Sequence, residues 1–210
     1  MSGEQLNLPA KSGSADDSGP NQLNAGRFQH GLGQFGPWVI NRTRDVFANS
    51  FVRMAVDEVT RPDGKAGEHV VVAIKPGVCV LALDEKDNLS LTSEFHYAIG
   101  RISLEAVSGG IDPGETPLQC AHRELREELG LIAREMEYLT TVDPFTSIMV
   151  SPTQIFLATG LNRVNADPEA TELITEVRIP LKAAAEMASR GEITHAPSCV
   201  GILLLAARLG

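Results

Sequence analysis

The chain has 210 residues, of which 43% are hydrophobic and 21% are charged, a composition typical of a soluble globular protein that buries a sizeable core. The formal net charge is −9 and no cluster of Lys and Arg stands out, which argues against an extended nucleic-acid backbone as a partner. The longest apolar run, residues 200–207, is far shorter than a membrane span, and the N-terminus lacks the apolar core of a secretory signal. We therefore expect neither a nucleic-acid-binding protein nor a membrane protein.

The cysteines limit the possible classes further. Cys79, Cys120 and Cys199 lie too far apart for a CxxC-type zinc site, and their odd number argues against a disulfide scaffold. We expect them to be small buried side chains of a protein that works in a reducing, cytoplasmic compartment.

The composition and the pattern change along the chain. Residues 1–33 are rich in Ser, Gly, Asp and Asn and offer little to bury, which predicts a disordered N-terminal arm. From residue 34 the sequence becomes strand-like, and residues 51–107 are expected to be mostly β-structure. The segments MEYLTTVD, TQIFLATGL and EVRIP predict later strands, and LKAAAEMASRG and APSCVGILLLAARL predict two closing helices. This order of elements predicts an α+β fold, a mixed sheet with flanking helices.

The first long helical pattern covers residues 117–129. Thr116 precedes a proline at the first helical position, Gln119 completes a capping box with Thr116, and Gly130 is placed to end the helix in the left-handed conformation. One apolar stripe is expected to face the core, formed by Leu118, Ala121, Leu125 and Leu129.

Three glutamates crowd another wedge of the same helix. Glu124, Glu127 and Glu128 fall together, and like-charged pairs among them should cost a few tenths of a kcal/mol each. Arg123 and Arg126 lie on the other flank, although Arg123 and Glu127, four residues apart, could still pair. One interpretation is a solvated acidic face, the usual fate of a charge run. The other is a site for Mg²⁺ or Mn²⁺, which prefer carboxylate oxygens. Sorting of the charges by sign and the glycine-rich loop SGGIDPGET just before the helix favour the cation site.

This stretch resembles the Nudix box, Gly-x5-Glu-x7-Arg-Glu-apolar-x-Glu-Glu-x-Gly-apolar. The matching residues are Gly109, Glu115, Arg123, Glu124, Leu125, Glu127, Glu128, Gly130 and Leu131. The resemblance implies an α/β/α sandwich that hydrolyses a nucleoside diphosphate linked to another moiety, with Mg²⁺ or Mn²⁺ as the cofactor. It also implies that Glu124, Glu128 and often Glu127 hold the metal, together with the backbone carbonyl of Ser108.

Sequence on both sides of the box resembles the ADP-ribose and nucleotide-sugar pyrophosphatase branch of the family. The implied organisation is a β-rich N-terminal subdomain, residues 34–74, exchanged between the two chains of a homodimer, and a hydrolase domain, residues 75–210. The implied substrate is a nucleotide sugar, cleaved to a nucleoside monophosphate and a sugar phosphate. Four residues are candidates for binding it: Trp38, His96, Arg101 and Pro144. His96 stands where the branch usually has a phosphate-binding Arg, and Phe145 stands where it commonly has Gly, which leaves the identity of the substrate within the branch open.

Each of these residues also has a plainer interpretation. Trp38 is either a platform that stacks on the base or a core anchor. Arg101 either grips a phosphate or is a solvated strand residue. His96 either contacts the substrate or packs as a neutral histidine. Glu105 either faces the metal-bound water, as the resemblance implies, or is a carboxylate on an edge strand.

The resemblance places the general base on a loop after the box. NADPEATEL is the acidic loop in that region, so Glu172 is the first candidate and Glu169 the second, followed by Glu105 and Glu127. Two rival functions remain open. One is a catalytically silent sensor of ADP-ribose or a nucleotide sugar. The other is a Nudix hydrolase of another substrate class, such as dinucleoside polyphosphates or NADH.

Overall fold

The computed structural model describes residues 32–165 and 173–209. Before the long helix lie β1 (Gly33–Phe35), β2 (Trp38–Ala48), β3 (Val52–Thr60), β4 (Ala66–Ile74), β5 (Gly77–Leu83), β6 (Asn88–His96), β7 (Arg101–Glu105) and β8 (Val107–Gly110). After them come α2 (Pro117–Leu129), β9 (Leu131–Val142), β10 (Met149–Val150), β11 (Thr153–Arg163), β12 (Thr175–Pro180), α3 (Leu181–Ser189) and α4 (Ala196–Leu209). The predicted succession of strands, helix, strands and closing helices is confirmed.

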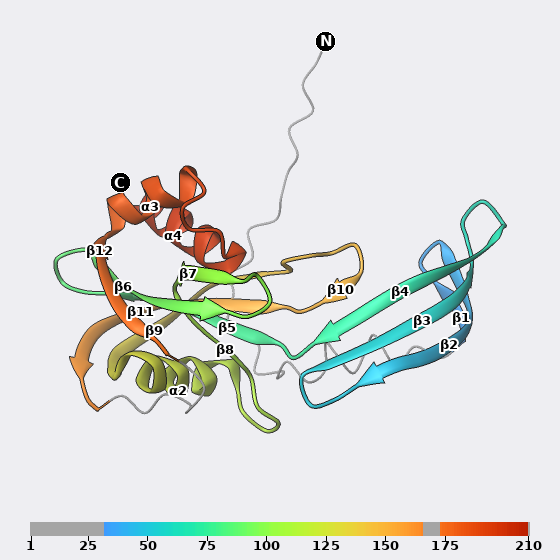
Figure 1. Cartoon of the computed structure of the whole chain (residues 1–210), viewed down its shortest axis with the longest axis horizontal. Coiled ribbons are helices and arrows are strands. Elements are labelled where there is room, and N and C mark those ends of the chain that lie inside the picture. The colour runs from blue at the N-terminus through green and yellow to red at the C-terminus, as the bar shows by residue number, and fades with distance from the viewer. Residues whose placement is uncertain (1–31, 166–172, 210) are drawn as a thin grey trace, which may run out of the picture.

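The strands form two sheets. The N-terminal sheet has the order β1-β2-β3-β4-β10 and projects away from the rest of the molecule (Figure 1). The central sheet has the order β12-β6-β5-β11-β9, with β7 paired to β6 and β8 paired to β5. Helices α3 and α4 cover one face of the central sheet and α2 covers the other (Figure 1). This arrangement is an α/β/α sandwich with a mixed sheet, because β5 and β11 are parallel while their other neighbours are antiparallel.

Strand β5 shows why the core has two layers. Its side chains alternate between the faces of the sheet, and both faces are covered, so the strand is a continuous apolar run. Cys79, Leu81 and Leu83 pack toward α3 and α4, in the core layer that contains Ile202 and Leu205. Val78, Val80 and Ala82 pack toward α2, in the layer that contains Leu125 and Leu129.

The ends predicted for the long helix are confirmed. Gln119 donates its backbone N–H to Thr116 Oγ1 at 3.2 Å, and its side-chain Oε1 accepts the N–H of Thr116 at 2.8 Å, which completes the capping box. Gly130 ends the helix with φ 59° in the left-handed region. The predicted apolar stripe is wrong at Leu118, which is 46% exposed, whereas Cys120 is fully buried. Because α2 packs against β8 as well as β5 and β9, its covered face turns toward Cys120.

A carboxylate fixes the turn between β5 and β6. Asp84 accepts the backbone N–H groups of Lys86 and Asn88, each at 2.8 Å, and it pairs with the Arg178 guanidinium. Burial alone would raise the pKa of Asp84, but the hydrogen bonds from Asn88, Lys86 and Arg178 outweigh it and lower the pKa to about 2.

We expect Asp84→Ala to lower the free energy of unfolding by about 1–3 kcal/mol at neutral pH, because the backbone N–H groups of Lys86 and Asn88 and the Arg178 guanidinium lose a charged acceptor. In the wild type this stabilisation is present above the pKa of an unfolded Asp, about 3.9, and is lost as the pH falls toward the folded value. Urea denaturation at pH 7 and under acid conditions measures both effects. Glu85→Ala, in the same turn but exposed, is the matched control and should change little.

No helix in residues 32–165 and 173–209 is both long and apolar enough to cross a membrane.

Candidate active site

The site begins where β8 runs beside the central strand β5. Cys79 pairs with Ser108 and Val78 with Gly109, so the end of β8 is held against the sheet core. Helix α2 crosses this end so closely that a Cβ on Gly109 would collide with the carboxylate of Glu124. The glycine is therefore required for the approach of the loop to the acidic wedge.

The glutamates of the wedge gather around this loop. Glu124 and Glu127 line a cleft of about 400 Å³ together with Ser108, Gly109 and residues from other segments. The Glu124 and Glu127 side chains are 12% and 26% exposed, so both are partly withdrawn from water. Glu128 Oε1 lies 3.4 Å from the backbone N–H of Ser108, on the same side of the helix. The three predicted carboxylates thus lie beside the end of β8, near Ser108 and Gly109.

Arg123 binds three of the neighbouring carboxylates. Its Nε and Nη2 form a bidentate pair with Glu115 at 2.9 and 3.0 Å, and its Nη1 lies 2.7 Å from Glu124 and 3.0 Å from Glu127. The hydrogen bond from Arg123 lowers the pKa of the Glu115 carboxyl, and these carboxylates raise the pKa of the guanidinium. The pair between Arg123 and Glu127 that the sequence allowed is present, and the contacts of Arg123 with Glu115 and Glu124 add to it.

The donor chemistry fits a hard divalent cation. Carboxylate oxygens and a backbone carbonyl are the ligands that Mg²⁺ and Mn²⁺ prefer, and the missing Cβ at Gly109 leaves room beside them. Within the described ranges, no three His, Cys, Asp or Glu side chains converge closely enough to bind a metal ion in this conformation. A cation bound through Glu124 and Glu127 would replace their ion pairs with Arg123.

A second group of polar side chains surrounds Glu105 at the end of β7. His96 Nε2 lies 3.2 Å from Glu105 Oε1, and His195 Nδ1 lies 3.3 Å from Glu105 Oε2. The Arg101 guanidinium donates to Thr194 Oγ1 at 2.7 Å, next to His195. His195 lines the same cleft as Glu124 and Glu127, so this group borders the candidate metal site.

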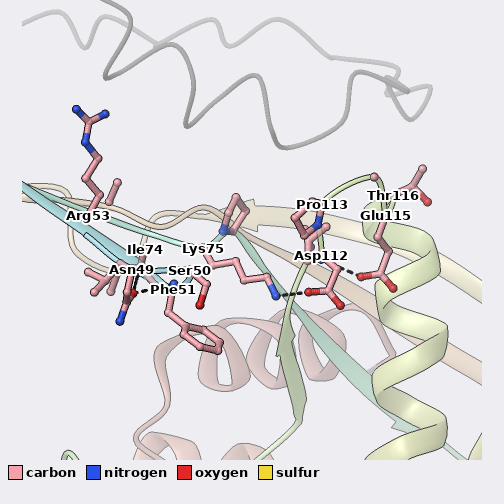
Figure 2. Close-up of a pocket in the computed structure, with 15 residues that line it drawn as sticks. Asn49, Ser50, Phe51, Arg53, Ile74, Lys75, Asp112, Pro113, Glu115 and Thr116 are labelled. Carbon is pink, nitrogen blue, oxygen red and sulfur yellow. Dashed lines mark hydrogen bonds and ion pairs between the residues drawn. The ribbon is translucent and has the colours of Figure 1, made fainter. Parts of the chain in front are cut away.

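A further cavity of about 420 Å³ lies between the N-terminal sheet and the box loop (Figure 2). Lys75, just after β4, reaches across to Asp112 at 2.5 Å, as Figure 2 shows. The Lys75 Nζ also lies 5.9 Å from the centre of the Phe51 ring. This cavity and the cleft share four lining residues: Phe51, Ile74, Lys75 and Asp112. The two hollows are therefore neighbours, and the cationic side chain of Lys75 lies at their junction.

Other predicted site residues lie elsewhere. Trp38 lies at the start of β2, against His69 at a ring distance of 5.8 Å, and lines neither cavity. Pro144 is exposed in the connection between β9 and β10. Glu172 and Glu169 lie outside the described residues. Sequence reasoning missed two cleft residues, His195 and Lys75, and the sole local signal for His195 is its place just before the last helix.

The comparisons with known proteins decide the family. Residues 73–197 match the family model described as the NUDIX domain. The chain belongs to the Nudix family. This Nudix protein is 32% identical over 151 residues to an ADP-ribose pyrophosphatase of Mycobacterium tuberculosis, covering 70% of this chain and 72% of the relative. It is 28% identical over 166 residues to a CMP-5'-(N-acetyl-N-hydroxy-3-aminopropyl)phosphonate hydrolase of Streptomyces rubellomurinus, covering 79% of this chain and 81% of that relative.

A solved structure of an ADP compounds hydrolase shares the Nudix fold of this chain. The TM-score is 0.70 at 22% sequence identity, over 85% of this chain and 96% of that chain. The family and fold predicted from the box are confirmed, and the protein is a Nudix hydrolase of the pyrophosphatase type. Nudix hydrolases generally use a divalent metal, in agreement with the oxygen donors of the cleft.

Proposed function

We propose that this chain is a Mg²⁺-dependent pyrophosphatase that hydrolyses the diphosphate of a nucleotide sugar, with ADP-ribose as the first candidate. The products are a nucleoside monophosphate and a sugar phosphate. The observation that supports this best is that Glu124 and Glu127 line one cleft with the glycine-rich end of β8, while Glu128 lies against the backbone N–H of Ser108. The names of the relatives, an ADP-ribose pyrophosphatase and a CMP-phosphonate hydrolase, support a substrate in which a nucleotide is joined to a small second group.

We assign a separate role to each residue of the cleft. Glu124, Glu127, Glu128 and the Ser108 carbonyl would hold the cation, which would neutralise the phosphates and acidify a water. Lys75 lies at the junction of the two hollows, where its charge can attract a diphosphate. Arg123 keeps the wedge compact through its ion pairs. The general base is Glu172, with Glu169, Glu105 and Glu127 as the alternatives.

Of the four candidates for substrate binding, two lie beside the cleft and two do not. His96 and Arg101 lie beside the cleft through their contacts with Glu105 and Thr194. Trp38 and Pro144 lie away from both hollows of their own chain. We therefore assign Trp38 and Pro144 to a site that is completed by a second copy of the chain.

Two exposed apolar surfaces support a homodimer. One is on the N-terminal sheet and includes Phe47 and Phe51, which are 52% and 66% exposed. The other is the β6–β7 hairpin, where Phe95 and Ile102 face each other in register and are 57% and 66% exposed. Clusters of this kind usually mark protein interfaces.

We expect light scattering to give a mass of twice 22.5 kDa at micromolar concentration. Phe95→Ser combined with Ile102→Ser should shift the protein toward monomer, because it removes apolar area from the interface. Ile132→Ser, at an exposed position on β9, is the control and should leave the dimer intact. A wild-type mass of one chain would contradict the dimer.

A hydrolysis panel tests the proposed activity. ADP-ribose, ADP-glucose, GDP-mannose, UDP-glucose, a CMP-linked phosphonate, NADH and nucleoside triphosphates are incubated with protein and Mg²⁺, and the products are identified by mass. The proposal expects a monophosphate and a sugar phosphate from a nucleotide sugar. Binding of ADP-ribose without turnover would favour the sensor instead, and turnover of NADH or triphosphates alone would favour another substrate class.

A further inference from the structure

The Glu105 group holds an imidazole in one defined state. Glu105 lies between two imidazole nitrogens, His96 Nε2 at 3.2 Å and His195 Nδ1 at 3.3 Å, and its side chain is 13% exposed. An ionised carboxylate has no hydrogen to donate. Both ring nitrogens that face it therefore carry the hydrogen, so His195 Nδ1 is a donor.

Ser198 is compatible with the same assignment. Its hydroxyl is fully buried, accepts the backbone N–H of Ala106 at 2.9 Å and lies 2.8 Å from His195 Nδ1 and 3.9 Å from Cys79 Sγ. With hydrogen on Nδ1, Ser198 Oγ accepts from both Ala106 and His195 and donates to the thiol, so all four groups are satisfied. The carboxylate of Glu105 decides between this arrangement and its reverse, because a ring nitrogen without hydrogen would place its lone pair against the carboxylate oxygen.

The other ring nitrogen of His195 is a hydrogen-bond acceptor. Burial lowers the pKa of the His195 imidazole, with Glu105 opposing this effect and His96 adding to it, so the ring is neutral at neutral pH. In a neutral imidazole with hydrogen on Nδ1, Nε2 carries a lone pair. His195 lines the cleft that contains Ser108, Glu124 and Glu127, so this acceptor belongs to a residue of the cleft wall.

We propose that His195 Nε2 accepts a hydrogen bond from an O–H group bound in this cleft. The inference rests on the proposed function, because it assigns a role in the same site. A phosphate oxygen is excluded as the partner, since it is an acceptor facing another acceptor. Two sources of the O–H group remain, a hydroxyl of the substrate's sugar and the water that attacks phosphorus. In both cases Glu105 and Ser198 act through His195 by fixing its tautomer.

The tautomer can be measured without substrate. In ¹⁵N-labelled protein, the ring nitrogen shifts and the two-bond couplings to the ring hydrogens show which nitrogen is protonated. We expect hydrogen on Nδ1 of His195, and we expect this preference to weaken in Ser198→Ala and Glu105→Gln. Hydrogen on Nε2 of His195 in the wild type would overturn the proposal.

A matched pair of variants tests the acceptor in the reaction. His195→Asn keeps an amide donor near the position of Nδ1 but has no atom at the position of Nε2, whereas the longer His195→Gln can place its amide oxygen there. We expect His195→Asn to lower kcat/KM by about tenfold or more, as for a lost hydrogen bond. We expect His195→Gln to retain most of the wild-type kcat/KM. His69→Asn, on the N-terminal sheet, is the control for loss of an imidazole.

The kinetic constants distinguish the two sources. If His195→Asn raises KM at constant kcat, and if this effect disappears with a substrate that lacks the sugar hydroxyl, the partner of Nε2 is the sugar. If His195→Asn lowers kcat at constant KM, the partner is the attacking water. Both constants within about twofold of wild type in His195→Asn would overturn the proposal. If the wild type hydrolyses nothing in the panel, the proposed function fails. The ¹⁵N measurement of the His195 tautomer needs no substrate and still tests whether Nε2 is an acceptor.

Discussion

We expect Glu124→Gln and Glu128→Gln each to abolish cation-dependent hydrolysis while the protein stays folded. Glu124 lines the cleft and Glu128 lies 3.4 Å from the backbone N–H of Ser108 at its edge, and an amide is a much weaker ligand for Mg²⁺ than a carboxylate. A catalytic cation contributes several kcal/mol to the barrier, so its loss should lower kcat/KM by more than about 10²-fold.

The fold should tolerate the same changes. Arg123 Nη1 lies 2.7 Å from Glu124, so the lost ion pair and the relieved repulsion within the wedge oppose each other. We expect the free energy of unfolding in EDTA to change by less than about 1 kcal/mol. Turnover within a few-fold of wild type in either variant would contradict the assignment of these glutamates to the metal.

Gly109→Ala removes activity without unfolding the protein. A Cβ at this position would overlap the carboxylate of Glu124, which is the far end of a flexible side chain. The side chain can move aside at little cost to the fold, but it then leaves the place where the cation has to be bound. Since loss of correctly placed ligands removes the contribution of the cation, we expect a fall in kcat/KM of about 10²-fold or more.

Gly67→Ala is the matched control for this prediction. Its nearest neighbour would be the flexible side chain of Arg61 at 3.0 Å, and it lies on β4 away from the cleft. Both variants should unfold at similar denaturant concentrations, and Gly67→Ala alone should keep full activity. Full activity of Gly109→Ala would show that Glu124 need not occupy the position seen here.

The helix of the box could be predicted from the sequence because its signals are local. The capping box of Thr116 and Gln119 and the left-handed Gly130 act within a few residues, and the structure has them as predicted. The wedge of glutamates follows from helical periodicity alone. For Arg123, helical spacing predicts the possible pair with Glu127 but not the contact with Glu115, since it fixes the direction of the Cα–Cβ bond and not the course of a long side chain. That side chain extends to Glu115, which precedes the helix.

The rest of the site depends on contacts between distant segments. Ser198 meets Ala106 across 92 positions and Lys75 meets Asp112 across 37, and both contacts exist because the central sheet brings their elements together. No local pattern around His195 indicates that its ring faces Glu105. The role of Trp38 stays a prediction, because Trp38 lines neither hollow of its own chain and no local pattern shows what a second copy would bring to it.

Titration with Mn²⁺, followed by the paramagnetic resonance of the free ion, tests most directly whether the acidic wedge is a metal site. We expect Glu124→Gln and Glu128→Gln to bind Mn²⁺ at least about tenfold more weakly than wild type. Glu68→Gln, an exposed glutamate on β4, should bind like wild type. Equal affinity of the wild type and the two wedge variants would contradict the account.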